Sequence, residues 1–140
     1  MPQLENKIFQ KIQTFNDKAE DLINAERFSD AIKEYQKAWN TLPEPRQLWD
    51  AGLWIKIGQA ECSLAQEDYS AGKQKLLDAI LCSGAVNNPL VHFLLGICCY
   101  ELGELACAKE ELQIAHDLEG DSIFQEGDEK YQNFLNSGDL

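Results

Sequence analysis

The sequence predicts an all-α protein, a solenoid of three stacked helix pairs with a C-terminal capping helix, in a single domain of 140 residues. Apolar residues recur at spacings of three and four, which is the period of amphipathic helices. Two pairs of small residues, Ala19 with Ala31 and Gly96 with Ala108, are each twelve residues apart. The same spacing in two places indicates a repeated helix pair. The prolines fall at predicted helix starts or in linkers, never inside a helix.

The first helix pair is predicted to span about residues 3–42. Its first helix, over residues 3–25, carries apolar side chains at helical spacing, namely Leu4, Ile8, Ile12, Phe15, Ala19 and Leu22. The chain turns near Arg27, and the second helix contains Ala31, Tyr35 and Ala38. This helix is expected to end at the proline-containing segment 42–45.

The middle pair is predicted to span about residues 45–82, with Trp54 and the Ile57-Gly58 dipeptide in its first helix and Gly72 in its second. Gly58 and Gly72 are fourteen residues apart, so we expect the turn inside this pair to be two residues longer than in the other pairs. Glu61 then stands where the pattern has a large apolar residue. The middle pair is therefore predicted to be irregular.

The third pair is predicted to span about residues 88–119. Asn88 is expected to cap its first helix and Pro89 to occupy the first helical position, where a missing N–H costs nothing. Residues 120–136 are predicted to form an acidic loop and a last helix, which Asp128 caps. A solenoid needs a terminal element over its last apolar face, and the apolar side of this last helix supplies one with Tyr131, Phe134 and Leu135.

The third pair has a recognisable pattern, His92-x2-Leu95-Gly96-x2-Cys99 followed by Ala108-x3-Leu112-x2-Ala115. It resembles the tetratricopeptide repeat (TPR), in which small residues allow two helix backbones to approach closely. The fold class is therefore expected to be an α-solenoid of three TPR-like helix pairs.

The net charge of −12 argues against a nucleic-acid partner, because phosphate binding needs a basic face. Residues 98–140 contain eleven acidic residues against two lysines, and this uneven charge favours a basic protein partner. The first residues lack an apolar run, so neither a signal peptide nor a membrane span is expected. Five cysteines without a framework spacing predict a reducing, cytoplasmic location.

No arrangement of residues in the sequence indicates catalysis. His92 is expected to be a buried structural histidine and His116 to lie near a helix C-terminus, without a second zinc ligand at helical spacing. The cysteines, Cys98 and Cys99 among them, form no C-x-x-C motif and are expected to be compact packing residues. We predict no enzyme, no catalytic residue, no cofactor and no metal site.

Binding is then the expected activity, on the concave side that the first helix of each pair lines in solenoids of this kind. The residues predicted to face a partner are Glu20, Asn24, Trp49, Ile55, Gln59, Phe93, Ile97 and Tyr100, with Glu101 and Glu104 at the rim. Aromatic side chains beside acidic ones are typical of protein-binding surfaces. The alternative for Trp49 and Phe93 is that they pack between repeats.

Several segments in order resemble a family of small acidic TPR immunity proteins of bacterial polymorphic toxin systems. The segments are Leu42-Pro43-Glu44-Pro45, Trp49 with Trp54, Cys82-Ser83-Gly84-Ala85, Asn88 to Gly96, Tyr100 to Gly103, and the tail from Ile123 to Leu135. The resemblance covers about residues 15–136. It implies that the protein neutralises a cognate toxin, expected to be basic, by direct binding in the cytoplasm.

Two other binding roles compete with this interpretation. One is a TPR adaptor or export chaperone for a secreted client protein. The other is a clamp for a C-terminal carboxylate, which is disfavoured because such a clamp needs lysine and arginine where this chain has Asn16, Glu20, Gln59 and Phe93. The identity of the partner and the oligomeric state stay open at this point.

Overall fold

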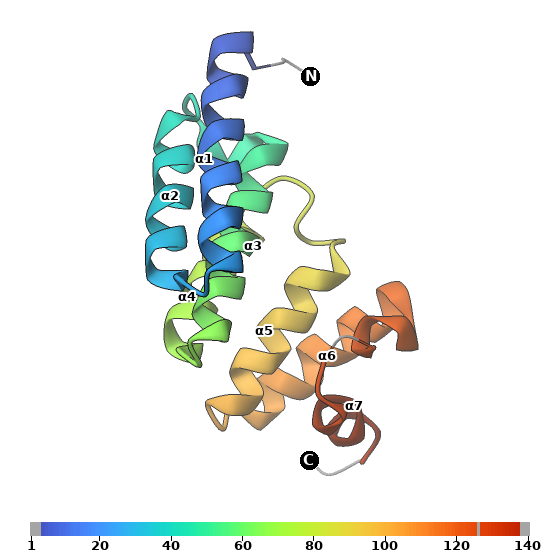
Figure 1. The fold of residues 1–140 in the computed structure, drawn as a ribbon. Coiled ribbons are helices and arrows are strands. Elements are labelled where there is room, and N and C mark those ends of the chain that lie inside the picture. The colour runs from blue at the N-terminus through green and yellow to red at the C-terminus, as the bar shows by residue number, and fades with distance from the viewer. Residues whose placement is uncertain (1–3, 126, 138–140) are drawn as a thin grey trace.

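The computed structural model describes residues 4–125 and 127–137, and within them every regular element is helical (Figure 1). The elements are α1 (Asn6–Asn24), α2 (Phe28–Thr41), the 3-10 helix η1 (Arg46–Leu48), α3 (Asp50–Ala65), α4 (Tyr69–Ile80), α5 (Pro89–Glu101), α6 (Leu105–Glu119), the 3-10 helix η2 (Asp121–Phe124) and α7 (Glu129–Asn136). The expectation of an all-α protein is confirmed.

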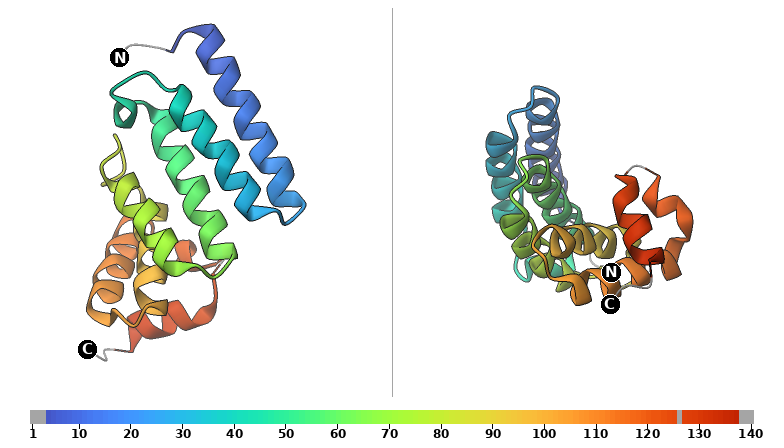
Figure 2. Two further views of the ribbon diagram at one scale, coloured as in Figure 1. Left: turned by 90° about the vertical axis from the view of Figure 1, so that its left-hand side faces the viewer. Right: turned by 90° about the horizontal axis from the view of Figure 1, so that it is seen from below.

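The helices form three pairs, α1 with α2, α3 with α4, and α5 with α6, and each helix packs chiefly against its neighbours in the chain. Figure 2 shows the pairs curving into a U, with α1, α3 and α5 on its inner side. Helix α7 follows α6 at the end of the second arm. This arrangement confirms the predicted α-solenoid with a C-terminal cap.

The turns inside the three pairs are alike. Each connects its two helices through three residues, 25–27, 66–68 and 102–104. The middle residue of each turn has a positive φ, which is 59° at Glu26, 57° at Glu67 and 78° at Gly103. The following N–H donates to the carbonyl oxygen five residues back, in Arg27 to Leu22 (2.8 Å), Asp68 to Ser63 (2.9 Å) and Glu104 to Cys99 (2.8 Å). The prediction of a longer middle turn is therefore wrong.

Equal turns change the register of the middle pair. The small residue twelve positions before Gly72 is Ala60, which is fully buried like Ala19 and lies in the position of Gly96. Gly58 has a different role, because a Cβ atom there would lie 2.5 Å from the ring of Tyr35 on α2. Choosing Gly58 as the repeat residue displaced the predicted faces of α3 by two positions.

The core consists of three hydrophobic clusters along the solenoid and is built on small residues where helices cross. Ala38, Ala79 and Ala115 occupy equivalent positions in the second helices and are each fully buried. A Cβ atom at Gly96 would lie 2.7 Å from the side chain of Leu112 on α6. The predicted close approach of α5 and α6 at Gly96 is confirmed.

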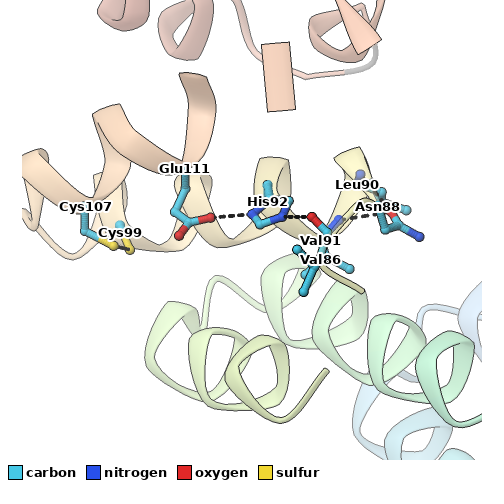
Figure 3. Close-up of polar contacts among 8 residues, drawn as sticks. All are labelled: Val86, Asn88, Leu90, Val91, His92, Cys99, Cys107 and Glu111. Carbon is cyan, nitrogen blue, oxygen red and sulfur yellow. Dashed lines mark hydrogen bonds and ion pairs between the residues drawn. The ribbon is translucent and has the colours of Figure 1, made fainter. Parts of the chain in front are cut away.

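Polar side chains fix the start of α5 (Figure 3). The Asn88 carboxamide oxygen accepts hydrogen bonds from the Leu90 N–H (2.9 Å) and the Val91 N–H (3.3 Å), and Pro89 follows the cap, as predicted. His92 lies one turn further along and is 6% exposed. Its Nδ1 contacts Glu111 Oε2 on α6 (2.7 Å), and its Nε2 contacts the Val86 carbonyl oxygen (2.8 Å). His92 therefore joins the 83–88 linker to both helices of the third pair.

The cysteines pack as small side chains. Four of the five are buried, and the Sγ atoms of Cys99 and Cys107 lie 2.6 Å apart between α5 and α6 (Figure 3). Burial, reinforced by the contact with Cys107, raises the pKa of Cys99 to about 12. Burial likewise raises the pKa of Cys98 to about 12. Both groups are therefore neutral thiols at ordinary pH, which suits close helix packing.

Candidate functional site

The structure places the ten residues predicted to face a partner at very different depths. Three are exposed, namely Glu20, Asn24 and Glu104. Three are half-buried, namely Trp49, Tyr100 and Glu101. Four are buried, namely Ile55, Gln59, Phe93 and Ile97, so the expectation that these four face outward is wrong.

Ile55 and Gln59 are buried because their side of α3 packs against the first pair, and the predicted register of α3 differs from the observed one by two residues. Ile55 belongs to the cluster that contains Ile12 and Leu42. The Gln59 side chain is completely buried, and its Nε2 donates to the Ile32 carbonyl oxygen and to Gln36 Oε1, both at 3.3 Å on α2. These two residues hold the first pair to the second.

The corrected register defines equivalent inward-facing positions on the three inner helices, which we call the first-helix strip. The strip consists of Gln13, Asn16 and Glu20 on α1, of Trp54, Ile57 and Glu61 on α3, and of Leu90, Phe93 and Ile97 on α5. Within it Ile57 is buried and belongs to the core. On α3 this strip brings Trp54 to the surface, where it is 57% exposed. An exposed tryptophan is unusual outside a binding surface.

Trp54 lies in a groove of about 940 Å³ between α1, η1 and the start of α3. Two further large apolar residues that line it are also exposed, Phe9 at 56% and Leu48 at 57%. Trp49 is half-buried in the same wall, and its indole N–H donates to the Pro43 carbonyl oxygen (2.9 Å). We call this feature the α1–α3 groove.

The α1–α3 groove is aromatic, and its described lining contains no basic residue. Asp50 is the one charged residue among the described residues that line it. The lysines of α1, Lys7, Lys11 and Lys18, recur about half a turn away from Phe9 and Asn16 and so lie on the other side of the helix. The groove therefore presents apolar rings, side-chain amides and a carboxylate.

Asn16 lines the groove from α1 and leaves one polar atom without a partner. Its Oδ1 is shielded from solvent and accepts no hydrogen bond from the described residues. A shielded acceptor without a donor costs free energy.

On the third pair the first-helix strip is covered by the chain itself. Phe93 meets Phe124 of η2 edge to face, with ring centroids 5.5 Å apart and an interplanar angle of 89°. Two residues of α7 contact Glu101 of α5. Lys130 forms an ion pair with its carboxylate, and the Tyr131 hydroxyl donates a hydrogen bond to Glu101 Oε1 (2.8 Å). Phe93 is therefore buried because η2 packs over it, and with Ile97 it belongs to the core cluster that includes Phe124 and Tyr131.

Helix α7 completes this cover in the way the sequence predicts. Asp128 caps it by accepting from the Lys130 N–H (3.0 Å), and its residues Tyr131 and Leu135 are buried. The Tyr100 ring packs edge to face against the rings of Tyr131 and Phe134, with ring centroids 5.5 Å and 5.1 Å apart. Tyr100 and Glu101 are thus occupied by contacts within the chain, and Glu104 binds Lys73 of α4 (2.8 Å).

Sequence reasoning missed Phe9, Leu48 and the exposure of Trp54. Phe9 carried a usable signal, because it lies one residue off the apolar stripe of α1 and so falls on another face of the helix. Leu48 carried none, because its exposure depends on the short 3-10 helix η1. Trp54 required the correct register of α3.

Within residues 4–125 and 127–137, no three His, Cys, Asp or Glu side chains come together as metal ligands. No helix in the same part of the chain is both long and apolar enough to cross a membrane.

No protein-family model and no curated protein matches the chain. Solved structures do. The Yersinia enterocolitica type III secretion chaperone SycD, in complex with a peptide of the translocator YopD, has a TM-score of 0.73 at 18% identity over 91% of this chain and 92% of that chain. PcrH in complex with the chaperone binding region of PopB has a TM-score of 0.72 at 16% identity over 96% and 100%.

The first TPR of Spaghetti (RPAP3), bound to the HSP90 peptide SRMEEVD, has a TM-score of 0.70 at 15% identity, and 91% of this chain and 92% of that chain are covered. At these identities the likeness concerns the fold. Together with the three equal helix pairs, it shows that the chain has a TPR-like fold.

Proposed function

We propose that the protein is a binding module of the chaperone or adaptor type, which holds a segment of a partner protein in the α1–α3 groove. The observation that carries the proposal is the exposure of Trp54 and Phe9 on facing walls of one groove. Large aromatic rings gain free energy when a partner covers them, and they are enriched among the residues that dominate binding. Glu20 and Asn24 continue the surface of α1 beyond the groove and complete the proposed site.

The structural neighbours support a protein partner. SycD, PcrH and the RPAP3 repeat are each named in complex with a peptide or a region of another protein. The peptide on the RPAP3 repeat ends in Glu-Glu-Val-Asp, which is acidic. Among the described residues that line the α1–α3 groove there is no lysine or arginine to receive such an end, so the resemblance to the secretion chaperones gives the better guide.

The immunity role is the second candidate, and it is favoured by the charge. The net charge of −12 suits a cationic toxin domain, because nucleases that grip phosphates are basic. Both roles rest on the same groove and differ in what the bound partner does. We propose a cytoplasmic location for either role, on the ground that all five cysteines are unpaired thiols.

Site-specific photo-crosslinking tests the groove. A photoreactive phenylalanine analogue at position 9 should crosslink a defined partner in the native cell, and Trp54→Ala should abolish the product. The same analogue at position 118 provides the matched control, because Leu118 is exposed (43%) on α6 and does not line the groove. Equal products from both positions would contradict the proposal.

Co-expression with the product of a neighbouring gene separates the two roles. A client that aggregates alone and becomes soluble with this protein indicates a chaperone. A product that kills alone and is harmless with this protein indicates immunity. In either case Trp54→Ala should remove the effect while the variant remains folded, and full activity of the folded variant would exclude the groove.

A further inference from the structure

We infer that Cys99 and Cys107 are an oxidisable pair, which a peroxide converts to a reversible disulfide that locks α5 to α6. The pair lies in the third helix pair, so the inference goes beyond the proposed function and does not depend on the α1–α3 groove. Disulfides that form transiently in a reducing compartment are usually redox-sensing, which suits the proposed cytoplasmic location.

The two sulfur atoms lie close to bonding distance (Figure 3). Cys99 Sγ on α5 and Cys107 Sγ on α6 are 2.6 Å apart. A disulfide bond is about 2.05 Å long, so its formation requires the sulfur atoms to approach by only about half an ångström. The backbone fixes both residues, because the Glu104 N–H donates to the Cys99 carbonyl oxygen (2.8 Å) across the turn and the neighbouring Ala108 is fully buried.

The adjacent cysteine faces a different helix. A Cβ atom at Gly72 on α4 would lie 3.3 Å from Cys98 Sγ, so the Cys98 side chain points toward α4. Cys99 points toward α6, where it meets Cys107. The fold therefore prepares the pairing of residues 99 and 107 rather than a bond between the two neighbours in the sequence.

The two thiols differ in exposure in the way that a two-step oxidation requires. Cys107 is half-buried and within reach of a small oxidant, whereas Cys99 is fully buried. The Cys107 sulfur attacks one oxygen of hydrogen peroxide, the O–O bond breaks, and a sulfenic acid and water form. The Cys99 sulfur then attacks the sulfenic sulfur, the S–O bond breaks, and the hydroxyl leaves as water with the Cys99 proton. Two thiols and one peroxide thus give one disulfide and two water molecules.

Charged side chains from α4 and from the turn lie beside the pair. Lys73 Nζ binds both carboxylate oxygens of Glu104 (2.8 Å and 2.9 Å). The same ammonium interacts electrostatically with both thiols. Burial and the contact with Cys107 raise the pKa of Cys99, and the Glu104 carboxylate adds to this rise while the Lys73 ammonium opposes it. The lysine therefore favours the loss of a thiol proton, and the glutamate hinders it.

The experiment treats the full, reduced chain with hydrogen peroxide and maps its thiols by mass spectrometry. We expect the loss of two of the five free thiols and a mass lower by two hydrogen atoms. A glutamate-specific protease cuts after Glu101 and Glu104, so the peptides that contain Cys99 and Cys107 stay together only when a disulfide joins them. Dithiothreitol should separate them. Sulfinic acid at Cys107 with Cys99 still a free thiol would overturn the inference.

Variants identify the pair. Cys107→Ser should abolish the loss of the Cys99 thiol, whereas Cys98→Ala should leave the linked peptides unchanged. Oxidation should raise the Tm of the wild type by about 5 °C, because the bond closes a short loop, and it should not raise the Tm of Cys107→Ser. A Cys99 thiol that is lost equally in Cys107→Ser, or linked peptides that disappear in Cys98→Ala, would contradict the assignment.

Two further variants break the same ion pair and should change the oxidation rate in opposite directions. Lys73→Gln removes the cation and should slow disulfide formation about threefold. Glu104→Gln leaves the cation without its carboxylate and should accelerate disulfide formation about threefold. Rates that change in the same direction would come from loosening of the turn, and they would overturn the electrostatic role of Lys73.

Discussion

The two ends of the solenoid use the same strip of helix surface in opposite ways. On α1 and α3 the first-helix strip borders a groove that exposes Phe9 and Trp54 to solvent. On α5 the strip residues Phe93 and Ile97 are buried, in one cluster with Phe124 and Tyr131 of the tail. One repeat geometry thus supports an open groove with exposed aromatic rings at one end and a closed core at the other.

The difference comes from the side chains. The strip on α5 is apolar throughout, with Leu90, Phe93 and Ile97, so it requires a cover. The strip on α1 is polar, with Gln13, Asn16 and Glu20, and it is stable beside water. The tail packs on the α5 strip, because that apolar surface is unstable when exposed. The groove beside α1 stays open, because polar residues lie between its few aromatic rings.

The sharpest way to break this comparison is to remove one aromatic residue from each end. Tyr131→Ala should lower the free energy of unfolding by about 3 kcal/mol, because a buried ring and its contacts with Tyr100 and Glu101 are lost. Trp54→Ala should change it by less than about 0.5 kcal/mol, because the ring is exposed. Urea unfolding followed by circular dichroism measures both, and equal losses would contradict the contrast.

A second test compares the close contacts of glycines in the two regions. Gly96→Ala should cost about 1–3 kcal/mol, because its new methyl group would press on the fully buried Leu112 side chain and approach the Leu112 backbone. Gly58→Ala should cost less, since the contacting atoms belong to the outer end of the half-buried Tyr35 side chain, whereas at Gly96 the Leu112 backbone nitrogen also lies 3.2 Å away. Thermal melts of the two variants give the order, and the reverse order would show that α5 and α6 adapt more easily.

The ion pair that holds the tail predicts a pH dependence confined to the covered end. Burial alone would raise the pKa of Glu101, but hydrogen bonds from Lys130 and Tyr131 outweigh it and leave that pKa below the ordinary value of 4.5. A carboxyl with a lowered pKa in the folded state stabilises the fold above the ordinary value, and this contribution disappears as the pH falls through the folded value.

The wild type should therefore lose more stability than Glu101→Gln between about pH 6 and about pH 3. Unfolding of both proteins across this range measures the difference. Glu20→Gln serves as the control, because Glu20 is exposed on α1. Parallel curves for the wild type and Glu101→Gln would show that the ion pair does not stabilise the tail.

The smallest expected effect concerns the turns. Glu67 has a φ of 57°, which side chains other than glycine adopt at a cost, whereas the third pair has Gly103 in the equivalent position. Glu67→Gly should stabilise the protein by about 0.5 kcal/mol, and Gly103→Ala should destabilise it by a similar amount. Thermal melts of the two variants give the signs, and a destabilising Glu67→Gly would mean that the turns differ in strain.

Local chemistry explains the success of the sequence prediction at the third pair. Asn88, Pro89 and Asp128 act within a few residues of the chain, so their capping roles could be predicted and are confirmed. The apolar side of α7 likewise requires burial. Because only a short acidic segment separates α7 from α6, the third pair is the apolar surface within its reach.

The middle pair shows the limit of such reasoning. Gly58 and Ala60 are both small, and helix α3 is buried on most of its sides, from Gly52 to Ser63 with few exceptions. A helix with neighbours on several sides has no single apolar stripe, so its periodicity does not mark the face that meets each neighbour. The exposed position of Trp54 followed only from the contacts of Gly58, Ala60 and Gly72 with other helices.

The sequence by itself therefore determined the helices, their caps, the three-pair solenoid and the closed C-terminal end, because these depend on neighbouring residues and on the need to bury apolar surface. Only the tertiary structure decided which side chains face the groove. A shift of two residues turns an α-helix by about 200°, so a small error in register exchanges the buried face for the exposed one. Contacts between distant helices fix that register, and they place Phe9, Trp54 and Asp50 together in the α1–α3 groove.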